Sequence, residues 1–332
     1  MGARAIHGIR LNVSNIHLAV QFYTSIGMVE DLGMRLARDG ATTVLSAQDP
    51  SGLLDAASVS LRWPCDPYMH LNLVGRTSTS RASGWPKVAD QAGSTVLSLV
   101  VDDVDAETNR VRDAGGEVAV DPADTERLMG TTRSSFVLDP DGNVVELIQL
   151  APTAPWDLSR ASVFGADRSF LHFELNTDDL DTVSAFYAGF GFSHNPLNDV
   201  RANATYDVPD VDPYVTAWGQ SLMPHMAGVQ FFRLDDDPSE MHLEIMGWKD
   251  GLQDPTDAPV WQQRGVMRYC FKTRDLAGTL ADMQRRGVKI FMHDQRAGLA
   301  WGDSEWFYFA DPDGNILTFE EWFPTGHWGE RY

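Results

Sequence analysis

Cysteine, basic residues and long apolar runs are all scarce in this 332-residue chain. The two cysteines, Cys65 and Cys270, are too few for a disulfide framework, and neither belongs to a CxxC pair. Lysine and arginine total 26 against 47 aspartates and glutamates, so the net charge of −21 argues against nucleic acid and membrane surfaces as partners. No stretch reaches the about 18 apolar residues of a membrane span, and MGARAIHGIRLNV lacks the apolar core of a signal peptide. These absences favour a reduced, cytoplasmic setting.

Apolar residues make up 43% of the chain, which is enough for a sizeable core. At about 150 residues per domain, the length predicts two domains.

An internal repeat is the clearest pattern in the chain. The pentapeptide DPDGN occurs at 139–143 and again at 311–315, each time between two strand-like runs, and Asp-Gly there is a hairpin-turn signal. A second echo joins AVQFYTSIGM at 19–28 to VSAFYAGFGF at 183–192. The two halves of the chain therefore share one pattern.

Each half repeats again within itself. Four short segments, VSNI, VDDV, TDDL and TRDL, each follow an apolar strand-like run and are each followed by a glycine at the same spacing. Their third residues are helix N-cap types, and glycine suits the position after a helix end. The caps and glycines are Asn15, Asp103, Asp179 and Asp275, with Gly27, Gly115, Gly191 and Gly287. The repeating unit is a strand, a helix and then several antiparallel strands.

Four such βαβββ units predict an α+β fold. We expect residues 1–150 to form the first paired domain and residues 169–332 the second. The Pro-, Ser- and Gly-containing segment 151–168 fits no unit and is interpreted as the linker.

The four units and the DPDGN-x-x-E motif resemble the vicinal oxygen chelate superfamily, which includes glyoxalase I, bleomycin resistance proteins and extradiol dioxygenases. The resemblance implies that the units pair into two open, cup-shaped mixed sheets. It also implies a divalent metal in a cup, with ligands from the first and last strands of each unit. It implies a fold more firmly than a reaction.

In the first half, the resemblance places Gly8 and Val96 at the first-strand ligand positions, and neither can bind a metal. Glu146 follows DPDGN at the last-strand position. His7 is adjacent to Gly8, but strand alternation predicts that it points to the opposite face. The first half is therefore expected to be free of metal.

In the second half, the same positions fall on His172 and Glu244, with Arg268 and Thr318 as departures from the pattern. Glu320, two residues beyond Thr318 on the same strand face, is expected to supply the missing carboxylate. The predicted metal set is therefore His172, Glu244 and Glu320, which suits Fe²⁺ or Mn²⁺, with Zn²⁺ or Ni²⁺ as alternatives.

A metal-free site is the competing hypothesis. A guanidinium stays protonated and is not a metal ligand, so Arg268 would pair with Glu244 or Glu320, or hold a substrate carboxylate. Under either hypothesis we expect Arg268, Tyr308 and His242 to act in catalysis. His242 shares a strand face with Glu244.

Ten tryptophans favour an aromatic-lined pocket, although core packing explains most tryptophans in proteins. The expected substrate-binding residues are Trp322, Trp301 and Glu174. The substrate is expected to be a small, flat organic molecule, and the protein a monomer or a homodimer.

The function favoured by the resemblance is a metal-dependent enzyme similar to the extradiol dioxygenases, because the second half keeps more of the site than the first. A glyoxalase-like lyase or isomerase is the first alternative. A metal-free ligand-binding or antibiotic-resistance protein is the second.

Overall fold

The structure is a computed structural model that describes residues 2–31, 58–66, 68–75, 96–127, 130–150, 169–195, 200–201, 226–237, 241–252, 265–299 and 302–323. Each unit contributes its elements in one run. The first unit comprises β1 (Ala5–Val13), α1 (Ile16–Ser25), β2 (Val29–Glu30), β3 (Ser58–Arg62) and β4 (His70–Gly75). The second comprises β5 (Val96–Val100), α2 (Val104–Asp113), β6 (Glu117–Arg127), β7 (Gly130–Leu138) and β8 (Val144–Gln149).

The third and fourth units repeat this order. The third comprises β9 (Ser169–Thr177), α4 (Leu180–Ala188), β10 (Ser193–His194), β11 (Val200–Arg201), β12 (Met226–Arg233) and β13 (His242–Trp248). The fourth comprises β14 (Gly265–Lys272), α6 (Leu276–Arg285), β15 (Ile290–Leu299), β16 (Gly302–Ala310) and β17 (Ile316–Phe323). The four-unit α+β architecture predicted from the sequence is confirmed.

Helix starts and stops follow the predicted chemistry. The side chains of Asn15, Asp103, Asp179 and Asp275 each accept a hydrogen bond from a backbone N–H in the first turn of their helix. The four predicted stop glycines all have positive φ, between 74° and 111°. A side chain would be strained in this left-handed conformation, so glycine ends each helix at low cost.

The units pair differently from the expectation. The first sheet has the strand order β15-β16-β17-β14-β1-β4-β3-β2 and joins the first unit to the fourth. The second sheet has the order β10-β12-β13-β9-β5-β8-β7-β6 and joins the second unit to the third. The prediction that the first unit pairs with the second, and the third with the fourth, was therefore wrong. Side-chain periodicity identifies a strand, but the partner at its hydrogen-bonding edge depends on the whole assembly.

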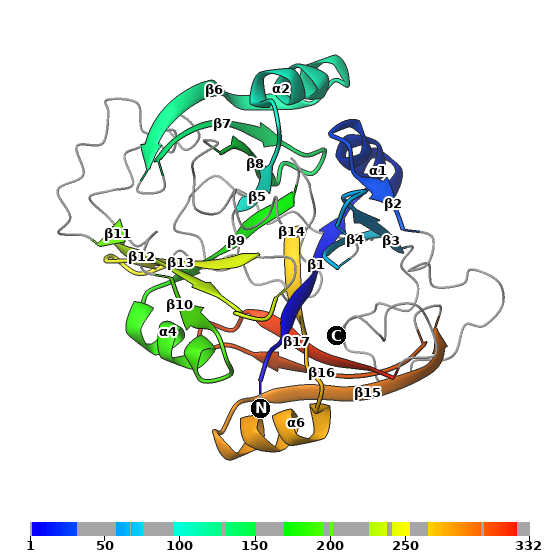
Figure 1. Cartoon of the computed structure of the whole chain (residues 1–332), viewed down its shortest axis with the longest axis vertical. Coiled ribbons are helices and arrows are strands. Elements are labelled where there is room, and N and C mark those ends of the chain that lie inside the picture. The colour runs from blue at the N-terminus through cyan, green and yellow to red at the C-terminus, as the bar shows by residue number, and fades with distance from the viewer. Residues whose placement is uncertain are drawn as a thin grey trace.

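In each sheet, the two units are joined by an antiparallel pair formed by the first strand of each unit. In the first sheet β1 pairs with β14, and in the second β5 pairs with β9. Figure 1 shows these strands crossing the middle of the molecule, with α1 and α2 at one end and α4 and α6 at the other. The expected linker, 151–168, lies outside the described residues.

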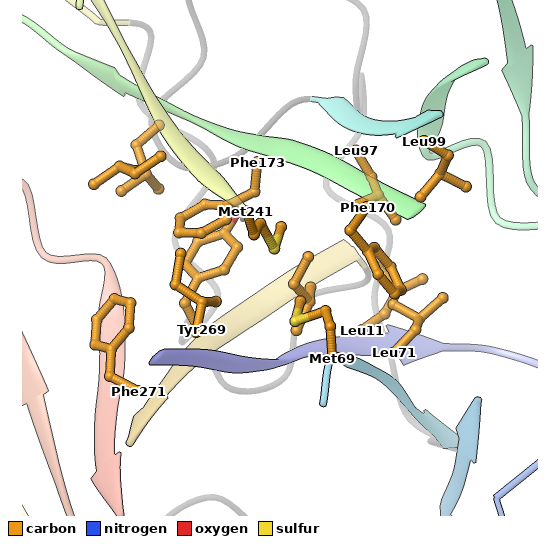
Figure 2. Packing of buried hydrophobic residues seen from close by; sticks show 14 of the residues in the cluster. Leu11, Met69, Leu71, Leu97, Leu99, Phe170, Phe173, Met241, Tyr269 and Phe271 are labelled. Atoms are coloured by element: carbon orange, nitrogen blue, oxygen red, sulfur yellow. The ribbon is translucent and has the colours of Figure 1, made fainter. Parts of the chain in front are cut away.

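One face of each sheet packs into a shared core. Leu11, Leu71 and Tyr269 from the first sheet meet Leu97 and Phe173 from the second, and Figure 2 shows these side chains interleaved. The rings of Phe173 and Tyr269 stack with centroids 3.6 Å apart. The opposite, concave faces carry the alternating residues of the same strands, and we call them the first cup and the second cup. Among the described residues, no helix is long and apolar enough to cross a membrane.

Candidate functional site

Three of the expected ligand positions meet in the second cup, where Ser98, and not the expected Val96, lies opposite His172. Ser98 on β5 lies opposite His172 on β9 in the antiparallel joint, and opposite Glu146 on β8 in the parallel pair. Glu244 comes from β13, the other neighbour of β9. Four adjacent strands, two from each unit, therefore bring these side chains to one place.

The contacts within this cluster are close. His172 Nε2 lies 2.9 Å from Glu244 Oε2 and 3.9 Å from Glu146 Oε2. The hydroxyl of Ser98 donates to Glu146 Oε2 at 2.6 Å. All four residues are buried. A buried imidazole flanked by two carboxylates is costly unless an ion or a proton compensates the negative charge.

Apolar side chains surround the cluster on the same sheet. Phe231 on β12 lies opposite Glu244, and its ring meets that of His172 edge-on at 5.6 Å. The indole N–H of Trp248 donates to Asn176 at 2.7 Å. The remaining apolar neighbours form one buried group, namely Val100, Ile148, Leu150, Leu171, Met226, Val229 and Met246. Such a wall excludes water and strengthens every charge interaction inside it.

The donor chemistry of the second cup fits a divalent transition metal. Imidazole and carboxylate are ligands for Zn²⁺, Mn²⁺, Fe²⁺ and Ni²⁺. His172 Nδ1 is buried without a hydrogen-bond partner among the described residues. Two ligands that are each about 2.0–2.2 Å from one ion lie about 3–4 Å apart, and the His172 Nε2 atom lies 2.9 Å from Glu244 Oε2 and 3.9 Å from Glu146 Oε2. Within the described ranges, however, no three His, Cys, Asp or Glu side chains are arranged so that they could hold a metal.

His242 and Glu174 belong to the same cup. They are buried, and Glu174 lies opposite Glu244 in the β9–β13 pair. The Nε2 atom of His242 lies 3.3 Å from the side-chain amide of Asn195. His242 thus lies opposite His172, in the same cup as Glu244, as expected from the strand face that His242 and Glu244 share.

In the first cup, the corresponding positions have lost their metal-binding chemistry. They are occupied by Gly8 on β1, Asn72 on β4, Arg268 on β14 and Thr318 on β17. A Cβ atom at position 8 would lie 2.8 Å from the side-chain nitrogen of Asn72, so glycine leaves room for that amide. These four positions offer no imidazole, thiolate or carboxylate, which are the side chains that hold most divalent transition metals in proteins.

Glu320 belongs to the first cup and not to the set with His172. Its Oε2 atom lies 3.2 Å from His7 Nε2, and its Oε1 atom accepts from the indole of Trp322 at 2.6 Å and from Ser304. The prediction that Glu320 completes a metal set with His172 and Glu244 was therefore wrong. It assumed that the third unit shares a sheet with the fourth.

His7 reaches this cluster because β1 is irregular. The β1–β14 register shifts between Ile6 and Gly8, which is a β-bulge, so the period-2 prediction that His7 faces away was wrong. Burial lowers the pKa of His7 from 6.5 to about 4, against the opposing effect of Glu320. Burial alone would raise the pKa of Glu320, but Lys272 and His7 outweigh it and hold this pKa well below its usual range.

Lys272, Arg268 and Tyr308 complete the first cup. Burial lowers the pKa of Lys272, whose Nζ atom lies over the ring of Trp322. The guanidinium carbon of Arg268 lies 4.8 Å from the centre of the Tyr308 ring. Tyr308 therefore points into the cup. The expected pairing of Arg268 with Glu244 is excluded by their separate sheets.

One further residue of these clusters was misjudged from the sequence. Glu146 was recognised as a ligand position but assigned to an empty first half, and only the pairing of units places it with His172. Trp301, expected to bind substrate, lies outside the described residues.

Comparisons with known proteins agree with this architecture. The sequence model of the Glyoxalase/Bleomycin resistance protein/Dioxygenase superfamily matches residues 5–147 and 169–319. A Mycobacterium bovis protein provisionally named a glyoxylase is 28% identical over 170 residues, which cover 48% of this chain and 60% of that protein. The match thus spans less than two thirds of this curated relative.

Solved structures share the fold over nearly the whole chain. Glyoxalase I from Zea mays superposes with a TM-score of 0.59 at 16% identity, covering 96% of this chain and 92% of that one. A Bacillus subtilis protein provisionally named a dioxygenase gives a TM-score of 0.55 at 12% identity, covering 97% and 86%. At this level of identity, the likeness concerns the fold alone.

Proposed function

The chain belongs to the glyoxalase/bleomycin resistance protein/dioxygenase superfamily, and on that premise we propose that it is a metal-dependent enzyme acting on a small organic substrate with vicinal oxygen atoms. The meeting of His172, Glu244 and Glu146 in the second cup carries the proposal. These residues would hold the ion, with Ser98 orienting Glu146 through its hydrogen bond.

A divalent ion bound there would supply Lewis-acid polarisation of the substrate oxygens. The chain's own residues do the rest. Glu244, whose buried Oε2 atom lies 2.9 Å from His172 Nε2, would accept a proton from the carbon next to a substrate carbonyl. Phe231 and Trp248 give the organic part of the substrate an apolar wall and exclude water.

A lyase or isomerase reaction is favoured over ring cleavage. Non-haem iron oxygenases use two histidines and one carboxylate, which leaves open positions for oxygen and substrate. The ligand set proposed here instead comprises one histidine, His172, and two carboxylates, Glu146 and Glu244, while His242 of the same cup has its Nε2 atom 3.3 Å from the side-chain amide of Asn195. The FYFADPDG segment, which resembles the ring-cleavage signature, lies in the first sheet with Thr318 at its ligand position.

Metal content of the purified full chain tests the proposal. We expect about one divalent ion per chain after reconstitution with Mn²⁺, Zn²⁺, Ni²⁺ or Fe²⁺ and removal of excess ion. His172→Ala and Glu244→Gln should lose it, since removing one ligand weakens such a site strongly. Glu320→Gln is the matched control, because it changes a partly buried carboxylate of the other cup. No binding to the wild type, or full binding to His172→Ala, would contradict the proposal.

Oxygen uptake separates the two reaction classes. With the metal-loaded protein, we expect turnover of a thiohemiacetal of a 2-oxoaldehyde without oxygen consumption, and no oxygen consumption with catechols. Oxygen uptake on catechol addition that disappears in His172→Ala would instead assign ring cleavage.

A further inference from the structure

Lys272, on β14 in the first cup, is a buried amine in a chain that has few lysines. Of the 26 basic residues, only four are lysines, namely Lys87, Lys249, Lys272 and Lys289. Lys249 and Lys289 are exposed, whereas Lys272 is 3% exposed. Lys87 lies outside the described residues. A buried lysine differs from an arginine because its amine can lose a proton near neutral pH and then act as a nucleophile.

The contacts of this amine leave its nitrogen without a hydrogen bond. The Nζ atom of Lys272 lies over the ring of Trp322 and has no hydrogen-bond partner among the described residues. Glu320 lies beside Lys272 in the parallel β14–β17 pair, so the two side chains point to the same face. The carboxylate of Glu320 instead contacts His7, Ser304 and Trp322. The amine therefore has a negative charge close by but no atom that accepts its protons.

The charged neighbours of Lys272 do not prevent it from becoming neutral. Burial lowers the pKa of Lys272, and the charges of Glu320, Glu321 and Cys270 oppose this shift without outweighing it. His7, on the other side in β1, is itself kept neutral by burial at pH 7. An exposed amine with a pKa of about 10.4 is neutral in only about one molecule in 2,500 at pH 7. Lys272 is therefore much richer in the nucleophilic form than an exposed lysine.

We propose that the first cup is a carbonyl-binding site in which the Nζ atom of Lys272 forms a reversible imine with a small aldehyde. The nitrogen lone pair forms a bond to the carbonyl carbon, and the π electron pair of the carbonyl moves onto its oxygen. One proton passes from the nitrogen to this oxygen, which takes a second proton from solvent and leaves as water. The product is an iminium cation, nothing is oxidised or reduced, and hydrolysis reverses the step.

The surroundings of the amine suit the charge of the product. A buried cation is costly unless an opposite charge or another favourable contact compensates it. The pKa of Glu320 lies well below its usual range, so this side chain stays ionised and faces the iminium. The face of the Trp322 ring attracts the same cation. His7 and Ser304 hold the carboxylate in place through their contacts with its two oxygens.

The enclosed position of the amine favours an aldehyde over a ketone. An aldehyde carbon carries one hydrogen, so only one carbon substituent has to fit beside the nitrogen. The residue opposite Lys272 on β1 is Ala5, whose side chain is a single methyl group. Trp322 is partly buried and precedes the exposed Phe323 at the end of β17, so we expect the aldehyde to enter past the indole.

Reductive trapping on the native full chain tests the site. The protein is treated at pH 7 with propanal and sodium cyanoborohydride, which converts an iminium into a stable secondary amine, and the alkylated lysines are located by peptide mass spectrometry. We expect Lys272 to be alkylated at least about tenfold faster than Lys249 and Lys289, because more of it is neutral. Lys289 is the matched control, since it also lies over an aromatic ring, that of Phe291, but is exposed. Equal or slower alkylation of Lys272 would overturn the proposal.

The pH dependence separates a nucleophilic amine from one that is merely accessible. The neutral fraction of an exposed lysine falls about 100-fold from pH 9 to pH 7. That of Lys272 should fall much less, so the ratio of Lys272 to Lys289 alkylation should rise at least about tenfold over this range. The ratio cancels the pH dependence of the reductant. A ratio that stays constant would contradict the assignment.

Variants identify the groups that take part. Lys272→Met, which keeps a side chain of similar length, should lose the one fast alkylation per chain, as followed by intact mass. His172→Ala should keep it, so that failure of this proposal is distinguishable from failure of the metal proposal. A fast alkylation that persists in Lys272→Met would show that another group reacts, and would overturn the assignment.

A second variant covers the case in which Lys272→Met does not fold. Glu320→Gln keeps the amine and removes the negative charge that faces the iminium. We expect trapping at Lys272 to slow at least about threefold relative to Lys289, the loss expected for one partly buried charge interaction. Unchanged trapping in a folded Glu320→Gln would show that the carboxylate does not support the iminium, and would overturn the site.

Discussion

Single residues in the two cups have environments that set their chemistry. In the first cup, burial lowers the pKa of His7 from 6.5 to about 4, so its imidazole stays neutral at pH values where an exposed histidine is charged. Its folded pKa lies below the unfolded value of 6.5, so the unfolded chain binds more protons between these values. The stability associated with neutral His7 is therefore complete above pH 6.5 and is lost as the pH falls towards 4.

His7→Phe should flatten this dependence. The free energy of unfolding of the wild type should fall more steeply from pH 6.5 to 4.5 than that of the variant, by up to about 1.4 kcal/mol per pH unit. Urea melts at several pH values measure the slopes. His17→Gln, at an exposed position of α1, serves as the control and should keep the wild-type slope. Equal slopes for the wild type and His7→Phe would contradict the assignment.

Glu146 is the residue whose role changed most between sequence and structure. Glu146→Gln should lower the affinity of the second cup for Mn²⁺ or Zn²⁺ by about tenfold or more, because it removes a charged ligand next to His172. Glu174→Gln, also buried in this sheet, is the control and should change the affinity less. A competition assay with a metal-sensitive dye measures both, and a larger loss in Glu174→Gln would reverse the two assignments.

At the scale of elements, the first helix of each half is hydrogen-bonded to the DPDGN turn of the same half. Tyr23 of α1 donates to Asp139 at 3.2 Å, and Tyr187 of α4 donates to Asp311 at 2.9 Å. Burial raises the pKa of both aspartates to about 6, although hydrogen bonds within each turn oppose it. These contacts cross from one sheet to the other, so the two units of each half contact each other through a helix and a turn and do not share a sheet.

A double-mutant cycle measures this tie. Tyr187→Phe should cost about 1–2 kcal/mol of stability, because it removes a buried hydrogen bond to a carboxyl group. Combined with Asp311→Asn, the losses should be less than additive. The same tyrosine change combined with Asp139→Asn, in the other turn, should be additive. Additivity in both cycles would show that the contact contributes nothing.

Elements were predictable from the sequence because their signals are local. Asp275 caps its helix by contacts within one turn, and Gly287 ends it within one residue. The partners of β1 and β5 were not predictable, because hydrogen-bonding edges carry no side-chain signature. The wrong predictions about Glu320 and Glu146 follow from the unknown strand partners, and the wrong prediction about His7 follows from the β-bulge in β1. Glu320 was grouped with His172 by chain proximity, and Glu146 was set aside for the same reason.

At the scale of the whole molecule, the two halves of the chain interlock. Residues 1–150 hold β1 and β5, and both strands lose their antiparallel partners if the second half is absent. An exposed central strand edge is a site of non-native pairing. Residues 1–150 expressed alone should therefore form dimers or aggregates.

Co-expression of residues 1–150 with 169–332 tests the interlock. The two pieces should copurify as a one-to-one complex with the metal affinity of the intact chain, as seen by size-exclusion chromatography with light scattering. A monomeric, cooperatively melting first half would contradict the observed pairing, because it would show that the first and second units complete a sheet by themselves.

The order in which the sheets can be completed differs from the order in which the chain is made. The second sheet needs only consecutive units, and its last strand, β13, ends at Trp248. The first sheet pairs β1, from the first unit, with β14, from the fourth, and β14 in turn with β17. On the ribosome, where earlier segments fold while later ones are still being added, the first unit synthesised is thus in the last sheet completed. β1 must wait, with one edge unpaired, for nearly the whole chain to emerge.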